Sequence, residues 1–116
     1  MGNPLSNNLL VGTVGELLVQ IRLLELGVQA SIPLKDTGND LVAIKGRTIK
    51  LIQVKTSIDT RHSFSNLPHI FDYIYSVKIS RSNDLFKLDN SVIQVYDNKR
   101  KLIGKLCKKL IEKTFV

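Results

Sequence analysis

The sequence contains little cysteine and no long apolar run. Its single cysteine, Cys107, cannot form a disulfide within the chain, and the two histidines leave no zinc-ligand spacing. A free thiol fits a reducing compartment, so we expect a cytoplasmic protein. No stretch approaches the roughly 18 consecutive apolar residues of a membrane-spanning helix, and residues 1–4 lack the basic start of a secretory signal. These absences argue against a membrane protein and against export.

Acidic residues are outnumbered by basic ones. The chain carries 17 lysines and arginines against 10 aspartates and glutamates, a formal net charge of +7. Residues 1–40 have two basic and four acidic side chains, whereas residues 99–116 have seven and one. This imbalance indicates an anionic partner such as nucleic acid. The length of 116 residues fits a single domain, and 43% hydrophobic residues suffice for its core.

The first part of the chain has the pattern of a helix. Apolar residues recur at steps of three and four between Asn8 and Gly27, which predicts an amphipathic helix ending at the glycine. Gly12 and Gly15 lie inside it, where each costs up to about 1 kcal/mol relative to alanine. Two such glycines in one turn indicate that another element packs closely against that face.

The middle of the chain has the pattern of strands. Residues 28–34 are predicted to be extended. Residues 40–44 and 48–55 are predicted to form a hairpin, closed by a loop of about three residues around Gly46.

The second half of the chain is patterned more weakly. We predict a helix over Leu67–Val77, although the alternation of Phe71, Tyr73 and Tyr75 fits a strand equally well. The remaining predictions are a connection over residues 80–90, a second hairpin from residues 91–96 and 101–106, and, as an alternative for the end, a basic helix over residues 104–115. The whole predicts an α/β sandwich with a mixed sheet.

Several polar and charged residues lie on the predicted helix and on the predicted hairpin at residues 40–44 and 48–55. Glu16 lies in the helix, Asp40 opens one hairpin strand, and Gln53 and Lys55 lie near the end of the other. Counting from the hairpin turn places Asp40 opposite residue 52 or Gln53. Because Gln53 and Lys55 are two residues apart, their side chains emerge on the same face of the strand. We therefore expect an acid, an amide and an amine to meet at this end of the hairpin.

Such a group suits metal-assisted hydrolysis of a phosphodiester, because Mg²⁺ prefers oxygen ligands and keeps several waters. Asp40 would supply the main carboxylate, with oxygen atoms from the Gln53 amide and the Val54 carbonyl. Glu16 would bind the ion directly or through water. The Lys55 ammonium would orient the attacking water or stabilise charge on the phosphate.

The segments Gly12-Thr-Val-Gly-Glu16, Asp36-Thr-Gly-Asn-Asp40-Leu-Val and Ile52-Gln-Val-Lys-Thr-Ser57 together resemble the PD-(D/E)XK nuclease superfamily. They follow its order of helix Glu, strand Asp and strand (Glu/Gln)-x-Lys, and the resemblance covers residues 8–57. The sequence is similar in particular to archaeal-type Holliday junction resolvases and to small endonucleases of mobile elements, including intron-encoded homing enzymes.

The resemblance implies a Mg²⁺- or Mn²⁺-dependent DNA endonuclease, either structure-specific like a resolvase or site-specific like a homing enzyme. It implies a restriction-endonuclease-like αβββαβ core, with a mixed central sheet flanked by helices. It also places Glu16, Asp40, Gln53 and Lys55 in active-site roles. Two positions depart from the pattern: Gln53 replaces the usual second acid, and Asn39 stands where a proline often precedes the first acid.

Two other functions remain as alternatives. The loss of one carboxylate at Gln53 would fit a catalytically inactive DNA-binding module on the same fold. A basic interaction protein unrelated to nucleases would fit the charge alone. Candidate DNA contacts are Lys50, Ser57, Arg61, Lys99, Arg100 and Lys101, although a basic run is also typical of a solvated surface. Because cutting both strands of a duplex needs two active sites, we expect a homodimer or a higher homo-oligomer.

Overall fold

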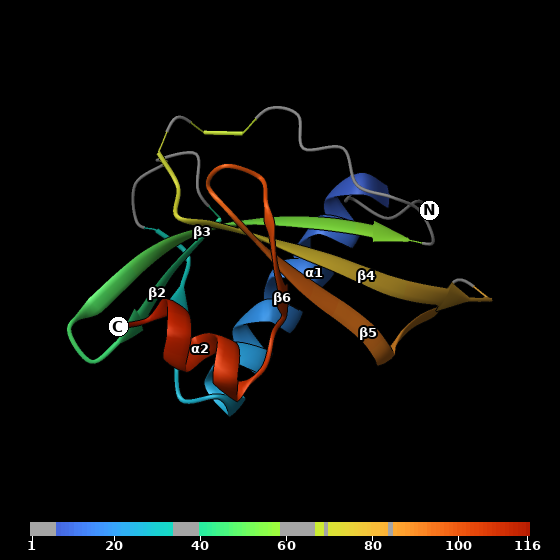
Figure 1. The fold of residues 1–116 in the computed structure, drawn as a ribbon. Coiled ribbons are helices and arrows are strands. Elements are labelled where there is room, and N and C mark those ends of the chain that lie inside the picture. The colour runs from blue at the N-terminus through green and yellow to red at the C-terminus, as the bar shows by residue number, and fades with distance from the viewer. Residues whose placement is uncertain (1–6, 34–39, 59–66, 69, 84) are drawn as a thin grey trace.

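The computed structural model describes residues 7–33, 40–58, 67–68, 70–83 and 85–116. Six strands form one mixed sheet in the order β1-β2-β3-β4-β5-β6, in which β3 and β4 are parallel and the other neighbours antiparallel (Figure 1). The elements are α1 (Asn7–Glu25), β1 (Gln29–Ser31), β2 (Leu41–Lys45), β3 (Thr48–Ile58), β4 (Tyr73–Ser82), β5 (Leu85–Asp97), β6 (Leu102–Lys105) and α2 (Lys108–Thr114). The predicted mixed α/β class is confirmed.

Helix α1 forms where the three- and four-residue periodicity predicted it. Its inward residues, which include Val19 and Leu23, are fully buried in the core. The helix ends before Gly27, whose positive φ of 81° suits a residue without a Cβ. The amphipathic pattern and the terminating glycine therefore position the helix as expected.

The two faces of the sheet differ in what covers them. Val54, Tyr75 and Val95 are aligned across β3, β4 and β5 and belong to the same core cluster as the buried residues of α1 and α2. Successive side chains of a strand point to opposite faces. Gln53 and Lys55 therefore lie on the face of β3 opposite the two helices.

The first hairpin is confirmed with a shorter turn than predicted. Lys45 pairs with Thr48, so the turn holds two residues, and Gly46 has a φ of 61°. Leu41 pairs with Ile52, and the Asp40 N–H donates to the Ile52 carbonyl at 3.1 Å. Asp40 consequently stands beside Gln53, as counted from the sequence.

Two predictions for the second half are wrong. The predicted helix over Leu67–Val77 is not formed, because residues 73–77 belong to β4, where Tyr75 and Val77 are fully buried. Residues 74–77 are all buried, which is typical of a central strand covered on both faces. The predicted connection over residues 80–90 is also wrong, since β4 continues to Ser82 past a register shift near Lys78, and β5 begins at Leu85.

The end of the chain contains both predicted alternatives in part. Strands β5 and β6 pair around a turn at residues 98–100, so the second hairpin is confirmed. A shorter basic helix, α2, follows at Lys108–Thr114 and buries Leu110 and Ile111 in the core.

Candidate functional site

The site lies at the edge of β3, where this strand extends further than its neighbour β2. Strand β2 begins at Leu41, opposite Ile52, whereas β3 continues to Ile58. Just before β2, Asp40 caps this edge: its Oδ2 accepts a hydrogen bond from the Val54 N–H at 2.8 Å. This bond holds the carboxylate at the point where β2 no longer pairs with β3.

Glu16 approaches Asp40 from α1. Burial raises the pKa of the Glu16 carboxyl above its ordinary value, and the negative charge of Asp40 raises it further. Burial also raises the pKa of Asp40, while the Val54 N–H and the Lys55 ammonium act against that rise. The charge of Asp40 therefore acts on Glu16, and Lys55 supplies a positive charge near Asp40.

Gln53 contributes a buried oxygen that lacks a protein partner. Its side chain is 7% exposed, and within the described part of the chain its Oε1 accepts no hydrogen bond. A buried amide oxygen without a partner costs free energy, which a bound water or a cation would offset. Gln53 is therefore the member of the site that best fits an additional ligand.

The Val54 carbonyl is a further oxygen ligand candidate, besides the carboxylates and the Gln53 amide. In a strand, the N–H and C=O of one residue point to the same side, and the Val54 N–H points toward Asp40. The Val54 C=O therefore points to the same open edge. Carboxylate, amide and carbonyl oxygens are the ligands that Mg²⁺ accepts. No cluster of three or more His, Cys, Asp or Glu side chains occurs in the ranges that the structure covers, so an ion here would need the amide and carbonyl oxygens.

One of the two helix glycines explains how Glu16 comes so close to the sheet. A Cβ on Gly15 would overlap Thr56 Oγ1 and lie 2.7 Å from the Thr56 Cβ, so only glycine fits at this contact. A Cβ on Gly12 would meet none of the described residues within 4 Å. The predicted close approach is confirmed at Gly15 and is wrong at Gly12.

The candidate DNA contacts are spread over the molecule. Ser57 lies on the same face of β3 as Lys55, two residues further on. Lys50 lies on the helix-covered face, with its Nζ 5.9 Å from the centre of the Tyr73 ring. Arg61 lies outside the described residues.

The basic run Lys99-Arg100-Lys101 is exposed at the β5–β6 turn. Asp97 Oδ1 holds this turn by accepting the N–H groups of Lys99 and Lys101 at 2.8 and 2.9 Å. Because these bonds use backbone N–H groups, they do not require the lysine side chains. Exchanging the side chains should therefore change the surface charge without breaking the turn.

Sequence reasoning missed Ser76. It pairs with Lys55 across β3 and β4 and is only 6% exposed, so a hydroxyl lies next to the lysine on the same face of the sheet. The residue was overlooked because its segment was predicted to be helical. The alternation of Tyr73, Tyr75 and Val77 is the signal that would have placed it in a strand.

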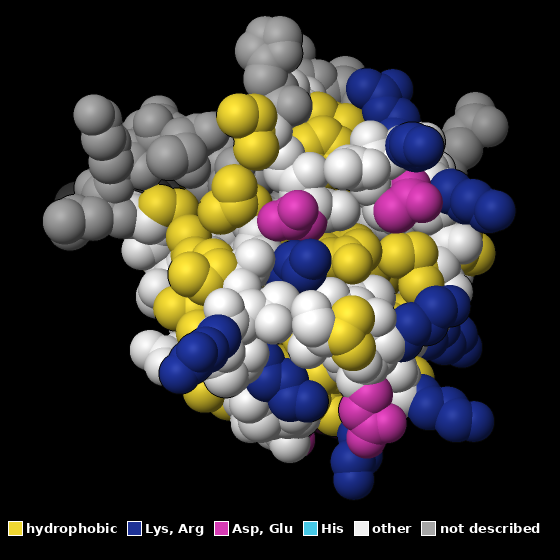
Figure 2. Space-filling view, turned by 60° about the vertical axis from the view of Figure 1, so that its left-hand side comes forward, with side chains coloured by type: hydrophobic (Ala, Val, Ile, Leu, Met, Phe, Trp, Pro, Cys, Tyr) yellow, Lys and Arg dark blue, Asp and Glu magenta, His cyan; other side chains and the backbone are white. Residues whose placement is uncertain are grey.

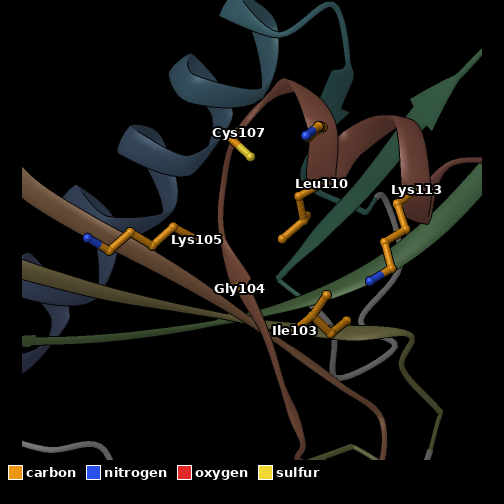
Figure 3. A pocket seen from close by; sticks show the side chains of 7 residues that line it. Ile103, Gly104, Lys105, Cys107, Leu110 and Lys113 are labelled. Carbon is orange, nitrogen blue, oxygen red and sulfur yellow. The ribbon is translucent and has the colours of Figure 1, made fainter.

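One cavity along the described chain lies apart from the acids. It has a volume of about 500 Å³ and lies between β6 and α2, where Ile103 and Leu110 line its apolar side (Figure 3). Lys113 extends along its rim, whereas Lys105 points away from it (Figure 3). Its described lining contains no carboxylate.

The raised pKa of Glu16 predicts a pH-dependent stability. A carboxyl whose pKa is raised on folding favours the folded state when protonated, and this contribution is lost as the pH rises through the folded-state value. Glu16→Gln should therefore melt at a higher temperature than the wild type at neutral pH. The difference should vanish below the ordinary carboxyl pKa of 4.5. Thermal unfolding followed by circular dichroism at both pH values measures it.

The exposed Glu112 on α2 provides the control. Glu112→Gln should melt like the wild type at both pH values. If the melting temperatures of Glu16→Gln and the wild type differ by the same amount at both pH values, the burial of the Glu16 charge is contradicted.

Comparison with protein-family models, with curated proteins and with solved structures finds no match for this chain.

Proposed function

We propose that this protein is a metal-dependent DNA endonuclease that hydrolyses phosphodiester bonds at the open edge of β3. The observation that carries the proposal is the Asp40 carboxylate, which interacts with the charges of Glu16 and Lys55 and lies beside Gln53, whose Oε1 accepts no hydrogen bond within the described residues. Two acids and an amine gathered with a buried, unsatisfied oxygen are costly to maintain for stability alone. A function that uses them accounts for that cost.

The residues divide into a metal-holding set and a substrate-facing group. Asp40, Glu16, the Gln53 Oε1 and the Val54 carbonyl would hold a Mg²⁺ or Mn²⁺ ion, which supplies Lewis-acid chemistry when bound. The Val54 N–H keeps the Asp40 carboxylate oriented. Lys55 would orient the attacking water or stabilise negative charge developing on the phosphate.

A second feature supports DNA as the substrate. Seven exposed basic residues lie at the β5–β6 turn, on β6 and on α2, and we call this set the C-terminal basic surface: Lys99, Arg100, Lys101, Lys105, Lys108, Lys109 and Lys113. Figure 2 shows that Lys and Arg side chains also outnumber Asp and Glu on the face that it brings forward. Such a surface attracts a phosphate backbone without reading its sequence.

The proposal is tested by incubating the purified protein with labelled four-way junction, linear duplex and single-stranded DNA, each with Mg²⁺, with Mn²⁺ and with a chelator. We expect cleavage that requires the divalent ion. Preference for the junction would indicate a resolvase-like enzyme. Binding without cleavage of any substrate would instead support the inactive DNA-binding module, and absence of both would support a basic protein with another partner.

The C-terminal basic surface predicts a specific salt dependence. Exchanging both Lys99 and Lys101 for glutamine should weaken DNA binding and lower the slope of log K against log salt by about 0.9 for each phosphate contact removed. Fluorescence anisotropy over a series of salt concentrations measures this slope. The matched control removes the same charge at Lys45 and Lys87, which lie outside the surface. An equal loss of slope in both variants would show that net charge, and not this surface, drives binding.

A further inference from the structure

Helix α1 is apolar on both its inward and its outward side. Leu18, Val19 and Leu23 fill the core, while four large apolar residues point away from the sheet and are 53–61% exposed: Leu9, Leu17, Ile21 and Leu24. At 100° per residue, these four lie on one side of the helix, opposite the buried residues. A helix that is apolar on both sides is typical of one covered on both sides.

The outward residues, which we call the α1 stripe, are large enough to matter energetically. Each exposes on the order of 100 Å² of apolar surface, about 400 Å² in all, which matches the largest apolar patch of a typical monomer. A standard interface buries about 800 Å² on each partner, with an apolar centre and a polar rim. The α1 stripe therefore has the dimensions of the centre of such an interface.

We propose that two copies of this chain associate through the α1 stripe. The charge distribution favours a second copy over an anionic partner, because α1 carries Glu16, Arg22 and Glu25 and is net negative, in a chain of net charge +7. Arg22 and Glu25 pair with each other at 2.8 Å, and Glu25 is the member of the pair nearer to the stripe. Two cationic molecules repel each other least where they meet through this helix, whereas a nucleic acid backbone or an anionic lipid surface is not attracted to it.

The stripe is self-complementary about a two-fold axis. If the axis passes at Leu17, the two helices run antiparallel, and Thr13 lies opposite Ile21 of the partner subunit. A small side chain opposite a branched one allows the helices to approach closely, as in ridges-into-grooves packing. No helix within the described ranges is long and apolar enough to cross a membrane, so the stripe is not part of a spanning segment.

Sedimentation equilibrium of the full chain tests this inference independently of any nuclease activity. The wild type should show a dimer of twice the 13.0 kDa chain mass. The double variant Ile21→Lys, Leu24→Lys should be a monomer, because it places like charges at the centre of the interface. The control variant Leu85→Lys, Ile49→Lys adds the same charge at apolar residues of similar exposure outside α1, and should remain dimeric. Circular dichroism shows that each variant is folded.

A second measurement covers the case in which the α1 variant fails to fold. In a Cys107→Ser background, Leu17→Cys should form an intermolecular disulfide under mild oxidation, because the two copies of residue 17 face each other at the axis. Leu85→Cys should not. A wild type that is monomeric at every concentration, a dimer that survives the α1 substitutions, or equal cross-linking at residues 17 and 85 would each overturn the inference.

Discussion

Exchanging Asp40 for asparagine is expected to lower the rate of metal-dependent DNA cleavage by about 10³-fold. Asparagine keeps an oxygen that can accept the Val54 N–H, so the local backbone should stay in place. What it removes is the negative charge that, with Glu16, would hold the divalent ion. Single-turnover cleavage of the preferred DNA substrate, with enzyme in excess, measures the effect on chemistry and ion binding without product release.

Lys55→Met should reduce cleavage to a similar extent for a different reason. Methionine retains much of the aliphatic stem but removes the ammonium group. The expected loss therefore lies in the orientation of water or in charge stabilisation at the phosphate, and not in the fold. The matched controls are Asp89→Asn and Lys87→Met, which make the same two exchanges at exposed positions of β5 and should cleave like the wild type.

Stabilisation of the fold by the divalent ion distinguishes a loss of ion binding, expected for Asp40→Asn, from a loss of chemistry alone, expected for Lys55→Met. A ligand that binds only the folded state at 100 times its Kd stabilises it by about 2.7 kcal/mol. Saturating Mg²⁺ or Mn²⁺ should therefore raise the melting temperature of the wild type and of Lys55→Met, but not that of Asp40→Asn. An Asp40→Asn variant that cleaves DNA at the wild-type rate would show that the β3 edge is not the active site.

The first half of the fold could be predicted because its signals are local. The periodicity of α1, the glycine after it and the glycine at the β2–β3 turn each act within a few residues, so each determines its own element. The second half could not be predicted in this way. The segment around Tyr73 and Tyr75 becomes a strand because it pairs with β3, far away in sequence, and its alternation alone did not exclude a helix.

The site shows the same division between local and distant information. That Gln53 and Lys55 share a face follows from their two-residue spacing, and that Asp40 lies beside them follows from the hairpin. The coupling of Glu16 to Asp40 depends on where the helix crosses the sheet. The sequence alone could not show whether Gly12 or Gly15 lies at that crossing, because the answer depends on the position of Thr56 in space.

Alanine at these two glycines should therefore act in opposite directions. Gly15→Ala should lower the free energy of unfolding by about 3 kcal/mol, because its methyl group overlaps Thr56 and forces the helix away from β3. Gly12→Ala should raise it by about 0.5–1 kcal/mol, because its methyl group meets none of the described residues within 4 Å and alanine is the better helix former. Urea denaturation of both variants and of the wild type measures the two changes.

Relief of the overlap tests the cause of the destabilisation. Adding Thr56→Ala to Gly15→Ala removes the hydroxyl and one methyl group from the contact but leaves the Cβ at 2.7 Å, so about half of the lost stability should return. The same variants test the site, because a helix displaced from β3 carries Glu16 away from Asp40. Gly15→Ala should then lose both stability and divalent-ion binding, while Gly12→Ala loses neither. Equal effects at the two glycines would mean that the contact with Thr56 does not set the distance between the helix and the sheet.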